Sequence, residues 1–363
     1  MRVQRIDKTF LFSIILITTV GFIVFLSASL GLLARAGASY QSVTTYQLIG
    51  LCIGAAGFVI ASKIPYTFWK KYSFYIFIII LLLNLLVFVP GIALYHGGAS
   101  RWINLGFVTF QPSEFLKIAF IIYFAAWLSG VKEKVKTFKM GILPFMVISG
   151  IVGAILIGQS DTDALIVIMA SGFAMLMAAG AKWRDIGILI LLAILGIGVI
   201  VAVRPYARAR IMTYLHPTAD TQGAGYQIAQ SLIAIGSGGT SGRGFGQSIQ
   251  KFNYLPEPIG DSIFAVAAEE FGFVGSVVLV SLYVFLAFRI FRISVRAPDS
   301  FGGLTVLGIG ILIIAESFMN IAAMLGIVPL SGEPLLFVSH GGTALIIMLC
   351  AAGLVANVSR KKG

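Results

Sequence analysis

One aspartate stands out as a candidate for acid–base chemistry because of where it lies in the chain. Asp261 ends a long polar connection and directly precedes the apolar stretch Ser262–Phe285. A carboxylate in such a place can act as a general base. It can also be a helix N-cap, a position where Asp is common. A capping box would need Glu or Gln three residues later, where the chain has Phe264, so both roles stay open.

Cationic residues recur in the polar connections that flank the same apolar stretches. Arginine binds phosphate groups through two parallel hydrogen bonds, so this group suits a pyrophosphate ligand. Pairing with the phosphates of membrane lipids is an equally good explanation. The residues concerned are Arg101, Arg204, Arg208, Arg210, Arg243 and Lys251.

A third set of ionisable residues lies within or at the start of apolar stretches. Glu114 and Lys117 are one helical turn apart, Glu269 and Glu270 follow Asp261 by about two turns, and Glu316 lies mid-stretch. Such groups cost several kcal/mol in a membrane unless they are paired or hydrated. They indicate either a polar cavity or proton path, or structural pairs between helices. The single histidines His216 and His340 have no ligand spacing, and we assign no metal to them.

Composition identifies the elements that must position these residues. The chain of 363 residues is 58% hydrophobic and 11% charged, with mean hydropathy +0.98, whereas soluble proteins carry about a quarter charged residues. Apolar runs long enough to cross a bilayer recur throughout, so we expect an all-α integral membrane protein of about ten helices. The expected spans are Phe10–Ser29, Gln47–Ala61, Phe74–Leu94, Ser113–Leu128, Met140–Ile157, Ala164–Ala181, Ile186–Val203, Ser262–Phe285, Leu304–Val328 and Leu335–Val355.

The distribution of Lys and Arg predicts the orientation. With the N-terminus in the cytoplasm, 18 of the 26 Lys and Arg residues lie on the inner side, as the positive-inside rule requires. Both termini are then cytoplasmic. The net charge of +12 is explained by this topology and by attraction to anionic lipid, so we expect no nucleic-acid partner.

We treat residues 1–363 as a single polytopic membrane domain with one large extracytoplasmic loop. Residues 204–260, between the seventh and eighth spans, form a connection of 57 residues. A structureless loop of that length is uncommon, so it should be ordered and carry part of an active site. Its centre, Tyr226–Ile235, is apolar enough to lie at the membrane interface.

Several sequence blocks resemble the FtsW/RodA/SpoVE family of shape, elongation, division and sporulation proteins. They occur in order over nearly the whole chain, and the Lys251–Glu257 form KFNYLPE is closer to the division branch (FtsW) than to the elongation branch (RodA). The blocks are Ser27–Ser29 (SAS), Gly98–Ala119 (GASRWINLGFVTFQPSEFLKIA), Arg204–Arg210 (RPYARAR), Gly225–Gln227, Lys251–Glu270 and Pro329–Thr343.

The resemblance implies a peptidoglycan glycosyltransferase of the bacterial cytoplasmic membrane that works on lipid II with a class B penicillin-binding protein. Other membrane proteins of division or elongation are expected partners. The family's essential loop aspartate aligns with Asp261, its motif Glu and Lys with Glu114 and Lys117, and its Arg-Trp with Arg101 and Trp102.

The chain also departs from the family pattern at several places. It has Ile259-Gly260 before Asp261 where His-Thr is usual, and Gln159–Ala164 reads QSDTDA where QPDxGT is usual. Ser339–Ala344 reads SHGGTA in place of SYGGSS, Leu215-His216-Pro217 replaces Leu-Asp-Pro, and Glu316 stands where Gln is expected.

The predicted mechanism is a single displacement that inverts the anomeric centre. Asp261 takes the proton from the acceptor GlcNAc 4-hydroxyl, which attacks C1 of the donor MurNAc and releases polyprenyl pyrophosphate. The predicted substrate-binding residues are Arg101, Trp102, Glu114, Lys117, Arg210, Arg243 and Lys251. No cofactor or metal ligand is assigned, although a divalent cation, Mg²⁺ or Mn²⁺, bridging the pyrophosphate and the carboxylate would be compatible with this chemistry.

Two other functions fit the same sequence. A flippase or transporter would centre on midplane groups such as Glu270 and Glu316, whereas an enzyme would centre on Asp261 and the long loop. A non-catalytic scaffold for a cell-wall synthase would need neither. The unusual polar sequence is concentrated outside, which favours the enzyme.

Overall fold

The computed structural model describes residues 6–34, 39–96, 99–104, 109–216 and 223–360. Within these ranges, eight helices are long and apolar enough to cross a membrane, and two shorter apolar helices accompany them. The eight helical spans are Lys8–Ala34, Tyr40–Lys63, Tyr66–Phe88, Pro112–Lys136, Phe138–Gly158, Trp183–Val203, Ile263–Val295 and Ser300–Met324, and the shorter helices are Thr162–Ala178 and Gly342–Val358. The predicted class of all-α membrane protein is confirmed.

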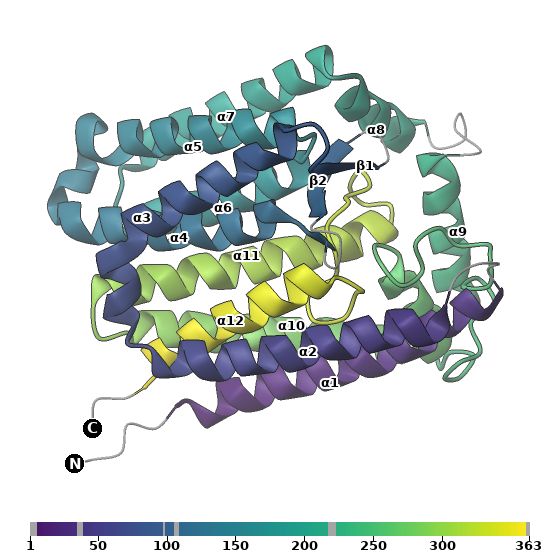
Figure 1. The fold of residues 1–363 in the computed structure, drawn as a ribbon. Coiled ribbons are helices and arrows are strands. Elements are labelled where there is room, and N and C mark those ends of the chain that lie inside the picture. The colour runs from purple at the N-terminus through teal and green to yellow at the C-terminus, as the bar shows by residue number, and fades with distance from the viewer. Residues whose placement is uncertain (1–5, 35–38, 97–98, 105–108, 217–222, 361–363) are drawn as a thin grey trace.

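The long helices run along one direction and form a bundle with both described ends of the chain at the same end, while α9 lies across that direction at the opposite end (Figure 1). In chain order the α-helices are α1 (Lys8–Ser29), α2 (Tyr40–Lys63), α3 (Tyr66–Leu85), α4 (Pro112–Val131), α5 (Leu143–Gly158), α6 (Thr162–Ala178), α7 (Trp183–Val203), α8 (Pro205–Leu215), α9 (Ala224–Ser237), α10 (Ile263–Val295), α11 (Ser300–Met324) and α12 (Gly342–Val358).

Several predicted boundaries were wrong. The third span starts at Tyr66 and ends before Ile92, because Ala93 and Leu94 belong to a strand. The last helix starts at Gly342, and residues 335–341 form an irregular segment before it. At the last span the error arose because Leu335–Val338 are apolar and buried but do not form a helix. At the third span the apolar Val89 and Leu94 lie in an exposed connection and strand, which hydropathy does not distinguish from a helix.

A small antiparallel sheet caps the bundle between α3 and α4. Its strands β1 (Ala93–His96), β2 (Ala99–Asn104) and β3 (Thr109–Phe110) pair in the order β1-β2-β3. This sheet was not expected from the sequence. It holds Arg101 and Trp102 on strand β2, and adjacent side chains of a strand leave it on opposite sides.

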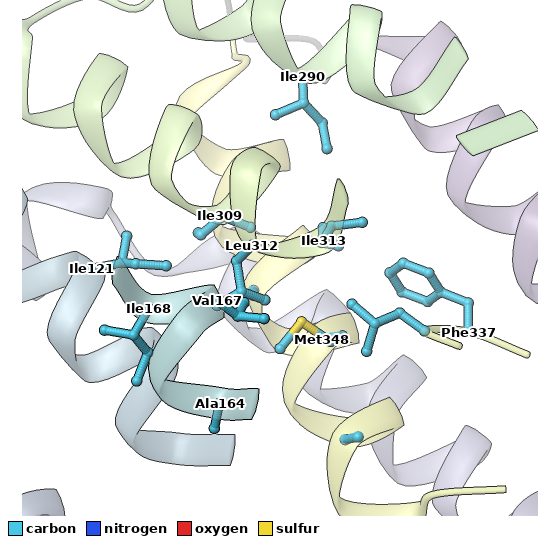
Figure 2. Packing of buried hydrophobic residues seen from close by; sticks show 14 of the residues in the cluster. Ile121, Ala164, Val167, Ile168, Ile290, Ile309, Leu312, Ile313, Phe337 and Met348 are labelled. Atoms are coloured by element: carbon cyan, nitrogen blue, oxygen red, sulfur yellow. The ribbon is translucent and has the colours of Figure 1, made fainter. Parts of the chain in front are cut away.

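The centre of the bundle is α11, which is surrounded by α4, α6, α10 and α12. Ile309 and Leu312 of α11 lie near Ile121 and Val167 in the core that Figure 2 shows. In lipid there is no water to drive helices together, so close packing supplies much of the stability. Helix α7, by contrast, has only Asp185, Ile186 and Leu189 buried, and the rest of its surface is free for lipid.

Helix α10 is interrupted near its start. Gly272 has φ 65° and ψ −164°, and a side chain there would collide with the backbone of residues 240–242. The loop donates to the carbonyl groups released by the break: Arg243 N–H to Glu269 O (3.0 Å) and Gly244 N–H to Glu270 O (2.9 Å). Irregular backbone is thus satisfied inside the protein, as the membrane interior demands.

The long connection 204–260 is ordered over the residues that the structure describes. It contains α8 and α9 and then a series of turns that ends at Asp261. The stretch Tyr226–Ile235 lies within α9, whose Ile228, Ser231 and Ala234 are buried. Residues 217–222, which include Pro217 of the departing Leu-His-Pro segment, lie outside the described residues.

Candidate active site

Asp261 is placed immediately before α10 but does not cap it. The N-cap of α10 is Ser262, and no side chain caps the helix through a hydrogen bond. The Ser262 hydroxyl instead accepts from Gln227 Nε2 of α9 at 3.0 Å. The prediction that Asp261 is an N-cap was therefore wrong, and its carboxylate is not engaged in capping α10.

The surroundings of Asp261 raise its proton affinity. Burial, followed by the nearby Glu257, raises the pKa of the Asp261 carboxyl to about 7, while Arg210 and Arg101 act in the opposite direction. No ion pair within 4.0 Å reaches its carboxylate among the described residues. A base works best when its pKa lies near the operating pH, so this environment suits proton abstraction at neutral pH.

Arg101 reaches the site from strand β2. Its Nη1 lies 3.9 Å from Asp161 Oδ1, and its Nη2 donates to the Ser160 carbonyl. Asp161 is itself held by Ser113 Oγ at 2.8 Å. The Arg101 Nε is buried without an acceptor, which native proteins rarely tolerate unless a ligand or water completes the bond.

Arg210 reaches the same region from α8. Its Nη1 donates to Asp163 Oδ2 at 2.5 Å, and its guanidinium lies 4.6 Å from the Tyr206 ring centroid. Asp163 also accepts from the Gly332 N–H at 3.0 Å. A Cβ on Gly332 would come within 3.4 Å of both Arg101 and Arg210, so the two guanidinium groups meet over this glycine.

The segment between α11 and α12 fixes the backbone around Asp261. The Ser339 hydroxyl donates to the Gly260 carbonyl at 2.8 Å, and the His340 N–H donates to the Ile259 carbonyl at 2.7 Å. Asn320 of α11 donates to the Asp261 carbonyl at 2.8 Å. Two departures from the family pattern, Ile259-Gly260 and Ser339-His340, therefore contact each other directly.

A second polar cluster lies deeper, around Lys117 of α4. Its ammonium contacts three carboxylates, at 2.9 Å from Glu114, 3.1 Å from Glu316 and 2.7 Å from Glu333. All four side chains are almost completely buried. Burial raises the pKa of the Glu333 carboxyl well above its usual range, although the Lys117 ammonium acts in the opposite direction. Asn320 Nδ2 also donates to the Glu333 carbonyl at 3.0 Å, which links this cluster to Asp261.

Two of the predicted substrate-binding cations lie in a different place. Lys251 is fully buried and its ammonium is 2.7 Å from Glu270, while Arg243 Nε is 3.3 Å from Glu269. Ser27 of α1 completes the group, because it donates to Glu270 at 2.5 Å and accepts from Lys251 at 3.2 Å. These residues fasten the end of the long loop to α1 and α10.

Sequence reasoning missed three contributors to the site. Asp161 and Asp163, which orient the two arginines, lie at the start of a short apolar helix, and Glu333 lies in the block Pro329–Thr343, to which no single role was assigned. Two carboxylates two residues apart before an apolar run were the available signal. Trp102 lies on β2 with its side chain partly buried, and no described contact joins it to Asp261.

The only described group of three carboxylates with metal-binding spacing is Glu114, Glu316 and Glu333, whose ligand atoms lie within 4.8 Å of one another. Lys117 donates a hydrogen bond to each of them, so the ammonium already occupies the position that a cation would take. This donor set does not fit a divalent cation while Lys117 is charged, and we assign no step to a metal.

Comparison with known proteins identifies the family to which this chain belongs. The model of the cell cycle protein family FtsW/RodA/SpoVE matches residues 7–363. The chain belongs to this family. A probable peptidoglycan glycosyltransferase FtsW from Geobacter sp. (strain M18) is 39% identical over 99% of this chain and 98% of its own length. The stage V sporulation protein E of Bacillus subtilis (strain 168) is 36% identical over 95% and 94%.

Solved structures agree with this placement. A chain from work on the structural coordination of polymerization and crosslinking by a peptidoglycan synthase complex superposes with a TM-score of 0.80, at 25% identity over 98% of both chains. The Thermus thermophilus rod shape determining protein RodA has the same fold, with a TM-score of 0.72. The predictions of family, membrane location and glycosyltransferase class are confirmed for this FtsW/RodA/SpoVE member.

Proposed function

We propose that this chain polymerises lipid II into glycan strands at the outer face of the cytoplasmic membrane, with Asp261 as the general base. The observation that carries the proposal is a carboxylate with a pKa of about 7, free of ion pairs among the described residues and faced by two arginines. The names of relatives that match nearly the whole chain support the same reaction class.

The reaction uses this arrangement as follows. Asp261 accepts the proton of the acceptor 4-hydroxyl as its oxygen forms the new glycosidic bond to C1 of the donor MurNAc. The bond from C1 to the phosphate oxygen breaks, and the electron pair leaves with polyprenyl pyrophosphate. Arg101 and Arg210 stabilise the charge that develops on the pyrophosphate, which is the kind of preorganised electrostatic contribution that accelerates such transfers.

Asp161 and Asp163 are positioning residues in this proposal. Each holds one arginine from the side, at 3.9 Å and 2.5 Å respectively, so the guanidinium groups are oriented before substrate arrives. Preorganised donors cost no rearrangement during the reaction. Asp163 is one of the departures from the family pattern noted in the sequence, since glycine is usual at this place in QPDxGT.

The comparison with a solved synthase complex supports a proposal for the partner. The solved relative comes from a complex that couples polymerization to crosslinking. We propose that this chain acts with a crosslinking enzyme, a class B penicillin-binding protein, and with other membrane proteins of division or elongation.

The test is polymerisation of labelled lipid II by the purified chain with its crosslinking partner in proteoliposomes. Asp261→Asn should fold and insert but lose at least about 100-fold in glycan yield, as expected for removal of a general base. Asp299→Asn is a matched control, because Asp299 caps α11 and Asn caps helices equally well. Wild-type glycan yield from Asp261→Asn would refute the base assignment.

One observation favours a transporter instead: the buried cluster of Lys117 with three carboxylates lies among the spanning helices α4 and α11. A flippase built around it would move labelled lipid II across vesicles without polymerising it. Glu316→Gln would then stop transport while leaving Asp261 intact. In our account the same variant keeps polymerising, because Lys117 retains Glu114 and Glu333 as partners. The transporter would be favoured if the wild-type protein makes no glycan and if Glu316→Gln loses the transport that the wild type shows.

A further inference from the structure

The end of the bundle that holds the described ends of the chain contains a hollow of about 530 Å³. It is separate from Asp261, because its lining residues belong to the last turns of α10 and to the residues at and after the end of α12, whereas Asp261 precedes the start of α10. Four arginines from these two elements line it: Arg289, Arg292, Arg296 and Arg360.

The charges around this hollow do not balance. Its one acidic lining residue is Asp7, whose carboxylate accepts from Arg289 Nη2 at 2.6 and 2.5 Å and from the Phe10 N–H at 2.9 Å. Asp7 is thus already engaged as the N-cap of α1. No described acidic side chain pairs with Arg292, Arg296 or Arg360 within 4.0 Å. Among the described residues, three positive charges therefore line the hollow without an acidic partner.

Two buried donors in the same side chains lack acceptors. The Nε atoms of Arg289 and Arg360 are buried and make no hydrogen bond. A buried donor without an acceptor is destabilising, so it usually has a ligand or water as its partner.

Helix electrostatics explains only part of this group. Cations near a helix C-terminus interact favourably with its dipole, which accounts for Arg292 and Arg296 at the end of α10. The dipole does not explain why Arg289 and Arg360 converge on the hollow with unsatisfied Nε groups. An anion with several oxygen acceptors would both balance the positive charge of the arginines and accept hydrogen bonds from the two Nε groups.

The neighbouring surface indicates the source of that anion. Each of three arginines on α10 is adjacent in sequence to an exposed apolar residue: Phe288 (58% exposed), Phe291 (57%) and Val295 (70%). On a spanning helix such residues face lipid chains. A lipid molecule can therefore place its phosphate in the hollow and its acyl chains along this face of α10.

We propose that this arginine-lined hollow is a binding site for the phosphate-bearing headgroup of an anionic phospholipid. Guanidinium groups match phosphate oxygens in geometry as well as in charge. The site would tie α10 and α12 to the lipid leaflet at the end of the bundle opposite Asp261.

The test compares lipid-dependent stability in the purified full chain. Thermal unfolding is measured in phosphatidylcholine nanodiscs with increasing phosphatidylglycerol or cardiolipin, and separately in detergent with inorganic pyrophosphate. The wild-type midpoint should rise with the anionic lipid. The Arg292→Gln/Arg296→Gln variant should need at least about tenfold more anionic lipid for the same rise, since each arginine near a charged surface contributes about 1 kcal/mol.

The matched control is Lys134→Gln/Lys139→Gln, which removes the same charge from exposed residues on the predicted cytoplasmic side, outside the hollow. It should respond like the wild type. If pyrophosphate but not anionic lipid raises the wild-type midpoint, and the arginine variant loses this rise, the hollow binds phosphate but its ligand is a soluble phosphate compound and not a lipid. Equal responses of the two double variants, or no wild-type response to either probe, would overturn the proposal.

Discussion

Two groups of outer-loop cations look alike in the sequence and differ completely in the structure. Around Asp261, Arg101 and Arg210 are partly exposed, at 13% and 17%, and lie beside a carboxylate that has no ion-pair partner within the described chain. Around Glu270, Lys251 is fully buried, and Ser27 joins both charges. We infer that the first group is arranged for a ligand and the second for stability.

Charged side chains that already have partners inside the protein stabilise the fold, whereas charged side chains that still lack partners can bind a ligand. In the Lys251–Glu270 group every described donor has an acceptor, so a substrate phosphate would have to displace an existing partner. In the Asp261 group the buried Arg101 Nε still lacks an acceptor. Mutations in the two groups should therefore affect different measurements.

The largest effect on stability is expected from Lys251→Ala. It leaves Glu270 charged and buried without its cation, which costs about 3–5 kcal/mol in comparable sites. Thermal unfolding of the purified chain should show the loss, and Lys251→Ala/Glu270→Ala should recover part of it. Arg243→Ala is the milder comparison, because that side chain is 38% exposed. If Lys251→Ala is as stable as the wild type, the Lys251–Glu270 group does not serve stability and the contrast with the Asp261 group fails.

Arg210→Ala should act on turnover instead. Removal of one preorganised donor to developing charge lowers the rate by about 10²-fold in comparable enzymes. The melting temperature should fall less than in Lys251→Ala, because the buried Asp163 keeps the Gly332 N–H and the charge of the nearby Arg101 after Arg210 is removed. Arg208→Ala, on the exposed side of the same helix α8, should polymerise lipid II normally. Equal activity of the two variants would remove Arg210 from the site.

A smaller effect is expected from Gly332→Ala. The added Cβ would lie 3.3 Å from Arg101 Nη1 and 3.4 Å from Arg210 Nη2, so both guanidinium groups must shift by a few tenths of an ångström. We expect a several-fold loss of rate with unchanged stability, because misplacement of positioned groups reduces rate strongly. Gly150→Ala on α5, where the new Cβ meets nothing within 4 Å, is the matched control. Indistinguishable rates for the two variants would show that Gly332 does not set the spacing.

Much of this account follows from sequence, because hydropathy and charge distribution report directly on membrane helices. The class of all-α membrane protein and the position of Asp261 before α10 were predicted correctly. Ten spans were expected where the described residues form eight long apolar helices and two shorter ones, and the predicted starts of the third and last spans were wrong. Hydropathy could not separate the buried segment 335–341 from a spanning helix. It also could not reveal the break at Gly272, which depends on contact with residues 240–242.

The site was less predictable than the fold. Arg101, Arg210, Arg243 and Lys251 share the same charge and the same predicted side of the membrane, so only tertiary contacts separate them. Arg210 meets Asp163, 47 residues earlier, while Lys251 meets Glu270, 19 residues later. Pairings of this kind depend on how helices pack, which the pattern of single residues does not contain.

The central claim is that Asp261 works as a carboxylate base tuned to neutral pH, and the pH dependence of polymerisation tests it most directly. With a pKa of about 7, Asp261 is protonated and inactive at lower pH, so the rate should rise about tenfold per pH unit below pH 7 and level off above it. Arg210→Gln should move this rise to higher pH, because Arg210 lowers the pKa of Asp261, while Arg208→Gln should leave it in place. A rate independent of pH between 5 and 8, or a profile that Arg210→Gln does not move, would contradict the account.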